Sequence, residues 1–103
     1  MREIRVRRTE VAPGAAVRIE GGAHPVCLVR IDDDFYALAD RCSHADVALS
    51  EGDVDSEERW IECWKHGSAF SLVDGAPQSL PATRPVAVFD VTVDGDDVVV
   101  ALP

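Results

Sequence analysis

Apolar and polar residues alternate in short stretches of the first 39 residues, a two-residue period that is typical of half-buried β-strands. The alternation is clear at 4–7 and 17–20, and longer apolar stretches occupy 26–31 and 35–39. Three consecutive aspartates, Asp32 to Asp34, separate the longer stretches. We interpret them as a turn, because they lack the spaced oxygen ligands of a calcium site. The pattern predicts strands and gives little indication of long helices.

The last part of the chain predicts a β-hairpin. Apolar-rich stretches at 87–93 and 98–102 flank Asp94-Gly95-Asp96-Asp97. An Asp-Gly pair suits a hairpin turn, because glycine adopts a positive φ angle at little cost. Short strands separated by glycine, aspartate and proline clusters are typical of a β-sandwich or a small barrel. We therefore expect an all-β fold.

The segment between these β-rich parts, at about 39–85, has a different composition. It contains two of the three cysteines, two of the three histidines, both tryptophans and three of the six prolines. The whole chain has 103 residues, of which 47% are hydrophobic, and this fits one globular domain. We expect a β base domain built from 1–38 and 86–103, carrying a loop-rich insert that bears the chemistry.

The insert contains two short motifs that each combine a thiol with an imidazole. Cys42-Ser43-His44 is followed, eighteen residues later, by Cys63-Trp64-Lys65-His66. One interpretation is a structural zinc site, which accepts two cysteines and two histidines in a tetrahedron. Zinc sites of this class usually begin with a closely spaced cysteine pair, whereas each motif here has a cysteine followed by a histidine. Zinc remains an alternative, but the spacing does not favour it.

The second interpretation is a [2Fe–2S] cluster in which two cysteines bind one iron and two histidines bind the other. Such a cluster needs one cysteine and one histidine from each of two loops. Cys42 and Cys63 would then meet at one iron, while His44 and His66 reach the other. The order of residues in the two motifs favours this interpretation.

Both motifs, with their neighbours, resemble the cluster-binding boxes of Rieske ferredoxins. The resemblance covers about residues 36–86, and the flanking strands agree with the family's antiparallel β-sandwich base in pattern alone. Proline often follows the second cysteine in the family, where this chain has Trp64. Val47 and Lys65 stand where Rieske proteins of respiratory bc complexes have a further pair of disulfide-bonded cysteines. The matching segments are Cys42-Ser43-His44-Ala45-Asp46, Leu49-Ser50-Glu51-Gly52, 61–70, Asp74-Gly75-Ala76-Pro77 and Leu80-Pro81-Ala82.

The resemblance implies a soluble one-electron carrier with one [2Fe–2S] cluster held by Cys42, His44, Cys63 and His66. Such ferredoxins pass electrons from a ferredoxin reductase to a Rieske non-haem-iron oxygenase, so the chain is expected to be an electron-transfer component and not itself an enzyme. Small subunits of nitrite reductase belong to the same family but commonly lack cluster ligands, and all four are present here. A redox sensor or accessory protein of iron–sulfur metabolism is an alternative, as is a zinc-stabilised interaction module.

The resemblance also implies roles for residues around the cluster. Ser68 matches a serine whose hydroxyl bonds a bridging sulfide, and Phe70 stands where high-potential members have a tyrosine. Lys65 would place a positive charge beside the cluster, and Pro81 belongs to the loop that covers it. Trp64 would shield the cluster and shape the docking surface. We expect a potential in the lower part of the Rieske range.

The net charge of the chain limits the classes of partner, and its targeting signals bear on its location in the cell. Ten basic and nineteen acidic residues give a net charge of −9, which argues against nucleic acids and anionic membranes. Eleven of the acids lie between Asp32 and Glu62. They contribute to solubility, and they also predict an acidic face that attracts a basic redox partner. No apolar run is long enough to cross a membrane and no secretory signal is evident, so we expect a cytoplasmic protein. The oligomeric state is not indicated.

The remaining unusual residues have simpler interpretations. An odd number of cysteines favours a reducing compartment or a metal site over a disulfide framework. Cys27 lies in an apolar stretch and is expected to be a buried free thiol. His24 is expected at the surface and Trp60 in the core.

Overall fold

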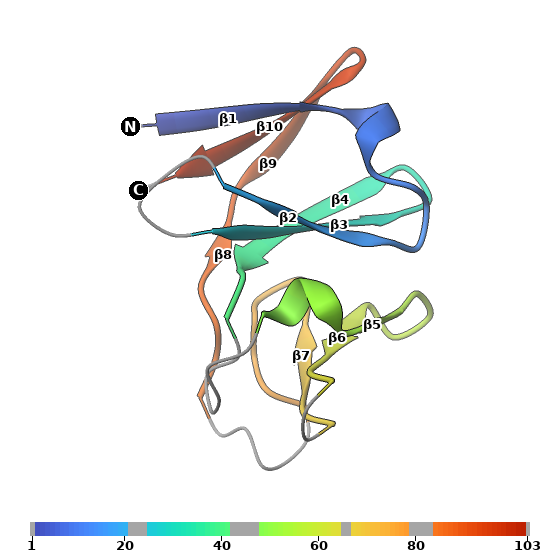
Figure 1. Ribbon diagram of the computed structural model, residues 1–103, viewed down its shortest axis with the longest axis vertical. Helices are drawn as coiled ribbons and strands as arrows, with labels where there is room; N and C mark the ends of the chain where they lie inside the picture. The colour runs from blue at the N-terminus through green and yellow to red at the C-terminus, as the bar shows by residue number, and fades with distance from the viewer. Residues whose placement is uncertain (1, 21–24, 42–47, 65–66, 79–83, 103) are drawn as a thin grey trace.

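The computed structural model describes residues 2–20, 25–41, 48–64, 67–78 and 84–102. This part of the chain is all-β and its strand pairs are antiparallel, as the sequence predicts (Figure 1). Its helices are two three-residue 3₁₀ turns, η1 (Arg8–Glu10) and η2 (Leu49–Glu51), neither long enough to span a membrane. The strands are β1 (Arg2–Arg7), β2 (Ala16–Ile19), β3 (Val26–Ile31), β4 (Asp34–Ala39), β5 (Asp53–Asp55), β6 (Trp60–Glu62), β7 (Ala69–Ser71), β8 (Val88–Phe89), β9 (Val91–Asp94) and β10 (Asp97–Leu102).

Two sheets form the base of the molecule. One has the order β1-β10-β9 and the other has the order β2-β3-β4-β8. Their facing sides enclose a hydrophobic core to which β3 contributes Val26 and Leu28 and β10 contributes Val98 and Val100. The core brings together side chains from the first and the last strands of the chain, so this sandwich depends on contacts distant in sequence.

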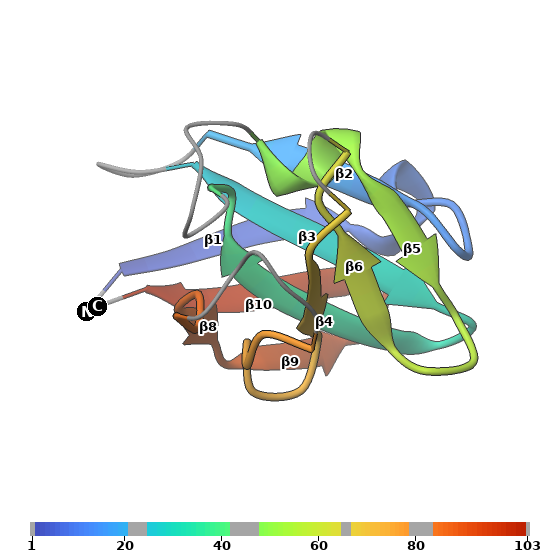
Figure 2. The same cartoon turned by 90° about the horizontal axis from the view of Figure 1, so that it is seen from below.

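The third sheet, with the order β5-β6-β7, lies beyond the opposite face of the β2-β3-β4-β8 sheet (Figure 2). A second core fills the space between them. Cys27 and Val29 of β3 face it, together with Ile61 of β6 and Phe70 of β7. Successive side chains of β3 therefore enter different cores, which explains why 26–31 is almost continuously apolar. The sequence did not predict this third sheet, because its strands have three residues each and show no measurable period.

Arg59 attaches this third sheet to the base. It lies in the β5–β6 turn with a φ of 60°, and its guanidinium donates hydrogen bonds of 2.8 Å to Asp34 Oδ2 and to Tyr36 Oη at the start of β4. The bond to Asp34, and then the one to Tyr36, raise the pKa of Arg59. The arginine therefore remains a cation that holds the β5–β6 turn against β4.

The predicted turns are present, but one predicted strand is divided. Asp32, with a φ of 53°, turns the chain between β3 and β4, and Gly95, with a φ of 61°, does so between β9 and β10. The stretch 87–93 forms two strands, because the chain passes from one base sheet to the other at Asp90. β8 pairs with β4, while β9 pairs with β10. Changing sheets in this way closes a corner of the sandwich.

Candidate metal centre

Cys63 directly follows β6 and is fully buried as a free thiol in the second core. Its backbone N–H donates to the carbonyl of Ser68 at 2.6 Å, and its own carbonyl accepts from the N–H of Gly67 at 3.0 Å. Gly67 has a φ of +74°, a value that glycine adopts without strain. These contacts close a tight turn between β6 and β7 that holds the thiol in a water-excluded place.

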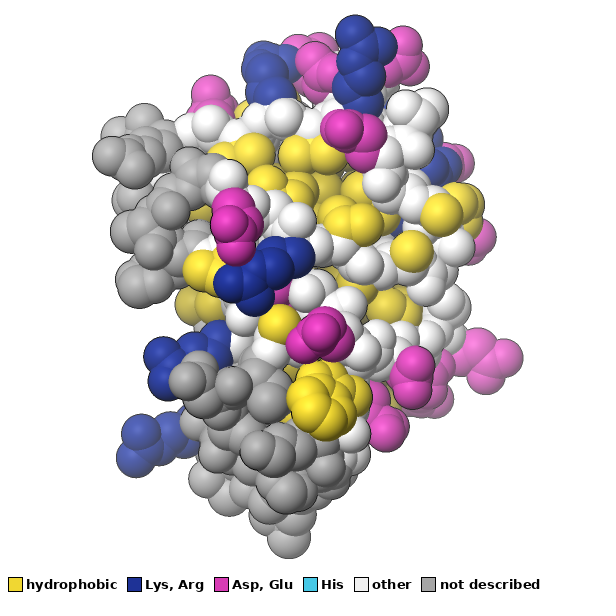
Figure 3. Space-filling view, in the orientation of Figure 1, with side chains coloured by type: hydrophobic (Ala, Val, Ile, Leu, Met, Phe, Trp, Pro, Cys, Tyr) yellow, Lys and Arg dark blue, Asp and Glu magenta, His cyan; other side chains and the backbone are white. Residues whose placement is uncertain are grey.

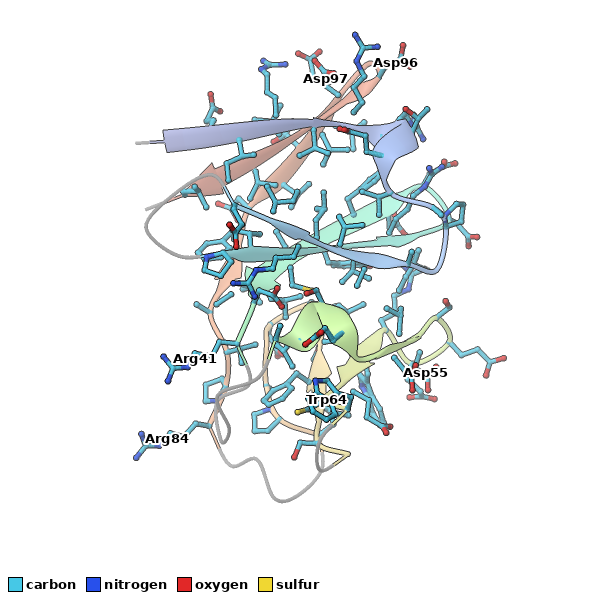
Figure 4. All side chains as sticks on the ribbon, in the orientation of Figure 1. Arg41, Asp55, Trp64, Arg84, Asp96 and Asp97 are labelled. Atoms are coloured by element: carbon cyan, nitrogen blue, oxygen red, sulfur yellow. The ribbon has the colours of Figure 1, made fainter. Side chains whose placement is uncertain are left out.

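Three predicted site residues near Cys63 in the sequence differ in their exposure to solvent: Trp64, Ser68 and Phe70. Ser68 and Phe70 are fully buried, Phe70 within the same core as the thiol. Trp64 is 55% exposed, so its indole lies at the surface directly after the buried thiol (Figure 4). The structure thus gives a buried serine at Ser68 and an exposed aromatic ring directly after the cysteine, and the roles expected of them at the cluster stay predictions.

Five of the predicted site residues lie outside the described part of the chain: Cys42, His44, Lys65, His66 and Pro81. Within the described part, no three histidine, cysteine or acidic side chains gather as metal ligands. The structure therefore places one predicted ligand, Cys63, and the set of four remains a prediction. Arg41, Trp64 and Arg84 adjoin the segments that contain the other residues, and they lie at the same end of the molecule (Figure 4).

The described residues fit a soft metal centre at this end. The Cys63 thiol is removed from water, and Ile61, Leu49 and Phe70 line the core into which it projects. The first Cys–His motif, Cys42-Ser43-His44, follows β4 in the chain, and Arg41, the residue before it, lies at this end as well. Thiolates and imidazoles brought to one water-poor place are suited to binding iron or zinc.

Two glycines, Gly52 and Gly75, allow backbone segments of this region to pack closely. This role was not predicted from the sequence. A Cβ on Gly52 would collide with the carbonyl oxygen of Glu62, the residue before Cys63. A Cβ on Gly75 would collide with the carbonyl oxygen of Val86. No sequence signal indicates the approach at Gly52, because the position of Glu62 beside it is set only in the folded chain.

A profile of the Rieske [2Fe-2S] domain family matches residues 4–90, most of the described chain and both Cys–His motifs. This chain belongs to the Rieske [2Fe–2S] domain family. It is 40% identical over 93 residues to the ferredoxin component of biphenyl 2,3-dioxygenase from Rhodococcus jostii, covering 90% of this chain and 85% of the relative. It is 42% identical over 94 residues to Ferredoxin CarAc from Metapseudomonas resinovorans, covering 90% and 86%.

Solved structures agree with these matches. The ferredoxin of carbazole 1,9a-dioxygenase from Nocardioides aromaticivorans superimposes with a TM-score of 0.93 at 35% identity, over 96% of both chains. Membership of the Rieske family decides between the two interpretations of the cysteine and histidine motifs. The cofactor of this Rieske domain is a [2Fe–2S] cluster and not zinc.

An acidic groove of about 360 Å³ lies on the β5-β6-β7 sheet of the Rieske domain. Its lining includes the carboxylates of Asp53, Asp55, Glu57 and Glu62. Acidic side chains gather on this side of the molecule, whereas Arg41 and Arg84 lie on the other side of the same end (Figures 3 and 4). Trp60, expected in the core, is half-buried and lines the groove instead.

Cys27 is the other described cysteine that is buried in the second core. It is a buried free thiol at the second residue of β3, as predicted. Burial raises its pKa, and the nearby negative charge of Asp40 raises it further. The thiolate is the form that attacks electrophiles and binds metals. Cys27 therefore remains a protonated packing residue in the folded Rieske domain.

Proposed function

We propose that this chain is a Rieske ferredoxin that carries one electron at a time from a ferredoxin reductase to a terminal oxygenase. The observation that carries the proposal is the match of 90% of the chain to 85–86% of the length of two ferredoxins, one of them named as a dioxygenase component. A ferredoxin at 40% identity, with a TM-score of 0.89, has been solved in complex with the oxygenase of carbazole 1,9a-dioxygenase. The chain acts as an electron-transfer component and not as an enzyme. We place it in the cytoplasm.

We propose Cys42 and Cys63 as ligands of one iron and His44 and His66 as ligands of the other. A cluster with this ligand set accepts and releases a single electron, at potentials of about −150 to +300 mV. The base built from 1–38 and 86–103 would support the insert at about 39–85. Within the insert, the turn closed by Cys63 and Ser68 fixes one thiol, and the apolar core around Phe70 keeps water away from it.

Visible and low-temperature EPR spectra of anaerobically purified protein, before and after dithionite, test the proposal. We expect a brown oxidised form and a rhombic reduced signal, with an average g value below that of all-cysteine clusters. Reduction by an NAD(P)H-dependent ferredoxin reductase, followed by turnover of an acceptor, would distinguish a carrier from a redox sensor. A colourless protein with stoichiometric zinc would contradict the electron-transfer proposal.

Replacing Ser68 with alanine is expected to lower the reduction potential. The buried Ser68 hydroxyl would donate a hydrogen bond to a cluster sulfide, and this bond favours the reduced, more negative state. Loss of one such bond corresponds to about a tenfold change in the oxidised-to-reduced ratio, or about 60 mV. Protein-film voltammetry measures the shift, and Ser56→Ala in the exposed β5–β6 turn serves as the control. An unchanged midpoint in Ser68→Ala would remove the hydroxyl from the proposed tuning groups.

Electron transfer to a basic acceptor is expected to slow as salt is added, because the acidic groove attracts positive charge. With cytochrome c as the probe, we expect the rate to fall about tenfold between low and physiological ionic strength. The double variant Asp53→Asn/Glu57→Gln should start slower and respond less to salt. Glu3→Gln/Asp96→Asn removes the same charge from β1 and from the β9–β10 turn, and it should behave like wild type. Equal rates in the two double variants would count against the groove as the docking side.

A further inference from the structure

Asp40 is a buried carboxylate whose two oxygens are both engaged. Its side chain has no exposed surface. Oδ1 accepts a hydrogen bond of 2.7 Å from the backbone N–H of Ser50, and Oδ2 accepts one of 2.6 Å from the Ser50 hydroxyl. A buried carboxylate is costly unless charged or hydrogen-bonding groups compensate it. In this structure the two hydrogen bonds from Ser50 compensate the burial of the Asp40 carboxylate.

The two partners lie at the two ends of one segment of chain. Asp40 directly follows β4, and Ser50 is the middle residue of η2. Between them are residues 41–49, which include Cys42 and His44. The paired hydrogen bonds therefore join a residue that precedes the first Cys–His motif to a residue that follows it.

Each end is also anchored to the rest of the molecule. The N–H of Asp40 donates to the carbonyl of Pro25 at 3.1 Å, and the N–H of Ala39 donates to the carbonyl of Ala87 at 2.9 Å. Leu49 of η2 is fully buried in the core that also contains Cys63. The clamp between Asp40 and Ser50 is thus fixed relative to the turn that carries the other thiol.

Arg18 completes the arrangement from β2. Its Nη1 lies 3.5 Å from Asp40 Oδ2, and its Nε donates to Glu20 Oε1 at 2.9 Å. The guanidinium is 44% exposed, so it offers a positive charge to the buried carboxylate while remaining in contact with water. The ion pair therefore adds a positive charge at Oδ2, the oxygen that also accepts from the Ser50 hydroxyl.

We propose that Asp40 is a positioning residue of the cluster, which fixes the two ends of the segment carrying Cys42 and His44 by bridging to Ser50. The inference rests on the proposed function, because it takes Cys42 and His44 as ligands. A loop whose ends are fixed loses less conformational freedom when its side chains bind the irons. Groups that orient ligands in this way typically change metal affinity by about ten- to a hundredfold when they are removed.

Three variants separate hydrogen bonding from charge in the holoprotein. Asp40→Ala removes the bridge, Ser50→Ala removes the shorter bond and keeps the backbone one, and Asp40→Asn can remake both bonds without the charge. Asp94→Ala is the matched control, because it removes an exposed carboxylate that pairs with Arg5 within the β1-β10-β9 sheet, away from Asp40. The measurements are the rate at which visible absorption is lost with an iron chelator, the far-UV circular dichroism, and the EPR spectrum and potential of the retained cluster.

We expect Asp40→Ala to lose the cluster about tenfold faster than both wild type and the Asp94→Ala control. The far-UV circular dichroism of Asp40→Ala should be unchanged. The rate of cluster loss in Ser50→Ala should lie between those of wild type and Asp40→Ala. The residual EPR signal of Asp40→Ala should be broadened. Asp40→Asn should retain the cluster within about twofold of wild type with the native line shape. Loss of a negative charge should raise its reduced-to-oxidised ratio several-fold at a fixed potential.

Three results would overturn the inference. The first is cluster loss in Asp40→Ala at the wild-type rate. The second is cluster loss in Asp40→Ala that occurs only as the strands unfold, because Asp40 would then stabilise the fold without positioning the ligands. The third is cluster loss in Asp40→Asn as fast as in Asp40→Ala, because the bridge would then not be what matters. A wild-type protein without the [2Fe–2S] spectrum would instead overturn the proposed function, so the two failures are distinguishable.

Discussion

A Cys63→Ala variant is expected to purify without colour and without an EPR signal after reduction. Cys63 is fully buried at the end of β6, and the turn closed by Gly67 and Ser68 holds it in position. No other described cysteine is placed to substitute for it, because Cys27 lies near the start of β3 and has a raised pKa. The loss would remove one of the two cysteine ligands proposed for one iron, so the cluster should not assemble.

The same variant should also unfold more easily, since a bound metal centre stabilises the folded state alone. Iron and sulfide analysis, visible spectra and thermal unfolding measure these effects. Cys27→Ala is the control, because it removes a buried sulfur of the same size from the same core. We expect it to remain brown and to lose about 1 kcal/mol of unfolding free energy. A Cys63→Ala protein with normal colour would show that Cys63 is not a ligand.

Gly52→Ala is expected to destabilise the folded protein strongly. Gly52 has an ordinary φ of −87°, so the effect does not come from backbone strain. The added methyl group would overlap the carbonyl oxygen of Glu62 and lie 3.2 Å from that of Leu49. Both are backbone atoms that cannot rotate away. Strand β5 would have to move from β6, at the residue before Cys63.

We expect Gly52→Ala to cost about 3 kcal/mol of unfolding free energy, a large part of the stability of a small domain. Thermal unfolding and the cluster content of the purified protein measure the two consequences. Gly95→Ala is the comparison, because its methyl group would meet nothing within 4 Å and the cost of a positive φ alone is about 1 kcal/mol. Equal losses in the two variants would mean that the close approach at Gly52 relaxes without cost.

The elements predicted best were those whose signals are local. The alternation at 4–7 and the Asp-Gly turn after 87–93 each depend on neighbouring residues, and both lie in strands or turns of the structure. The all-β class and the Rieske family followed from such patterns and from the two Cys–His motifs. Because those motifs are short and specific, the cofactor could be predicted before any contact was known.

The features that escaped prediction depend on contacts between distant residues. The division at Asp90 reflects which sheet each half joins, and the β5-β6-β7 sheet is made of strands too short to show a period. The hydrogen bonds from Ser50 to Asp40 also exist only in the folded chain. Gly52 looks like an ordinary loop glycine until the position of Glu62 is known. Each of these features depends on tertiary contacts, which patterns of neighbouring residues do not reveal.

The pairing of β1 with β10 has a consequence for the order of assembly. Arg2 lies opposite Leu102 and Arg7 opposite Asp97, so the first strand pairs with the last, across almost the full length of the chain. A ribosome releases the chain from its N-terminus, and such pairs form late. The β5-β6-β7 sheet, by contrast, closes within residues 53–71. Both Cys–His motifs have therefore left the ribosome, and are accessible to cluster assembly, before the sheet that completes the base can form.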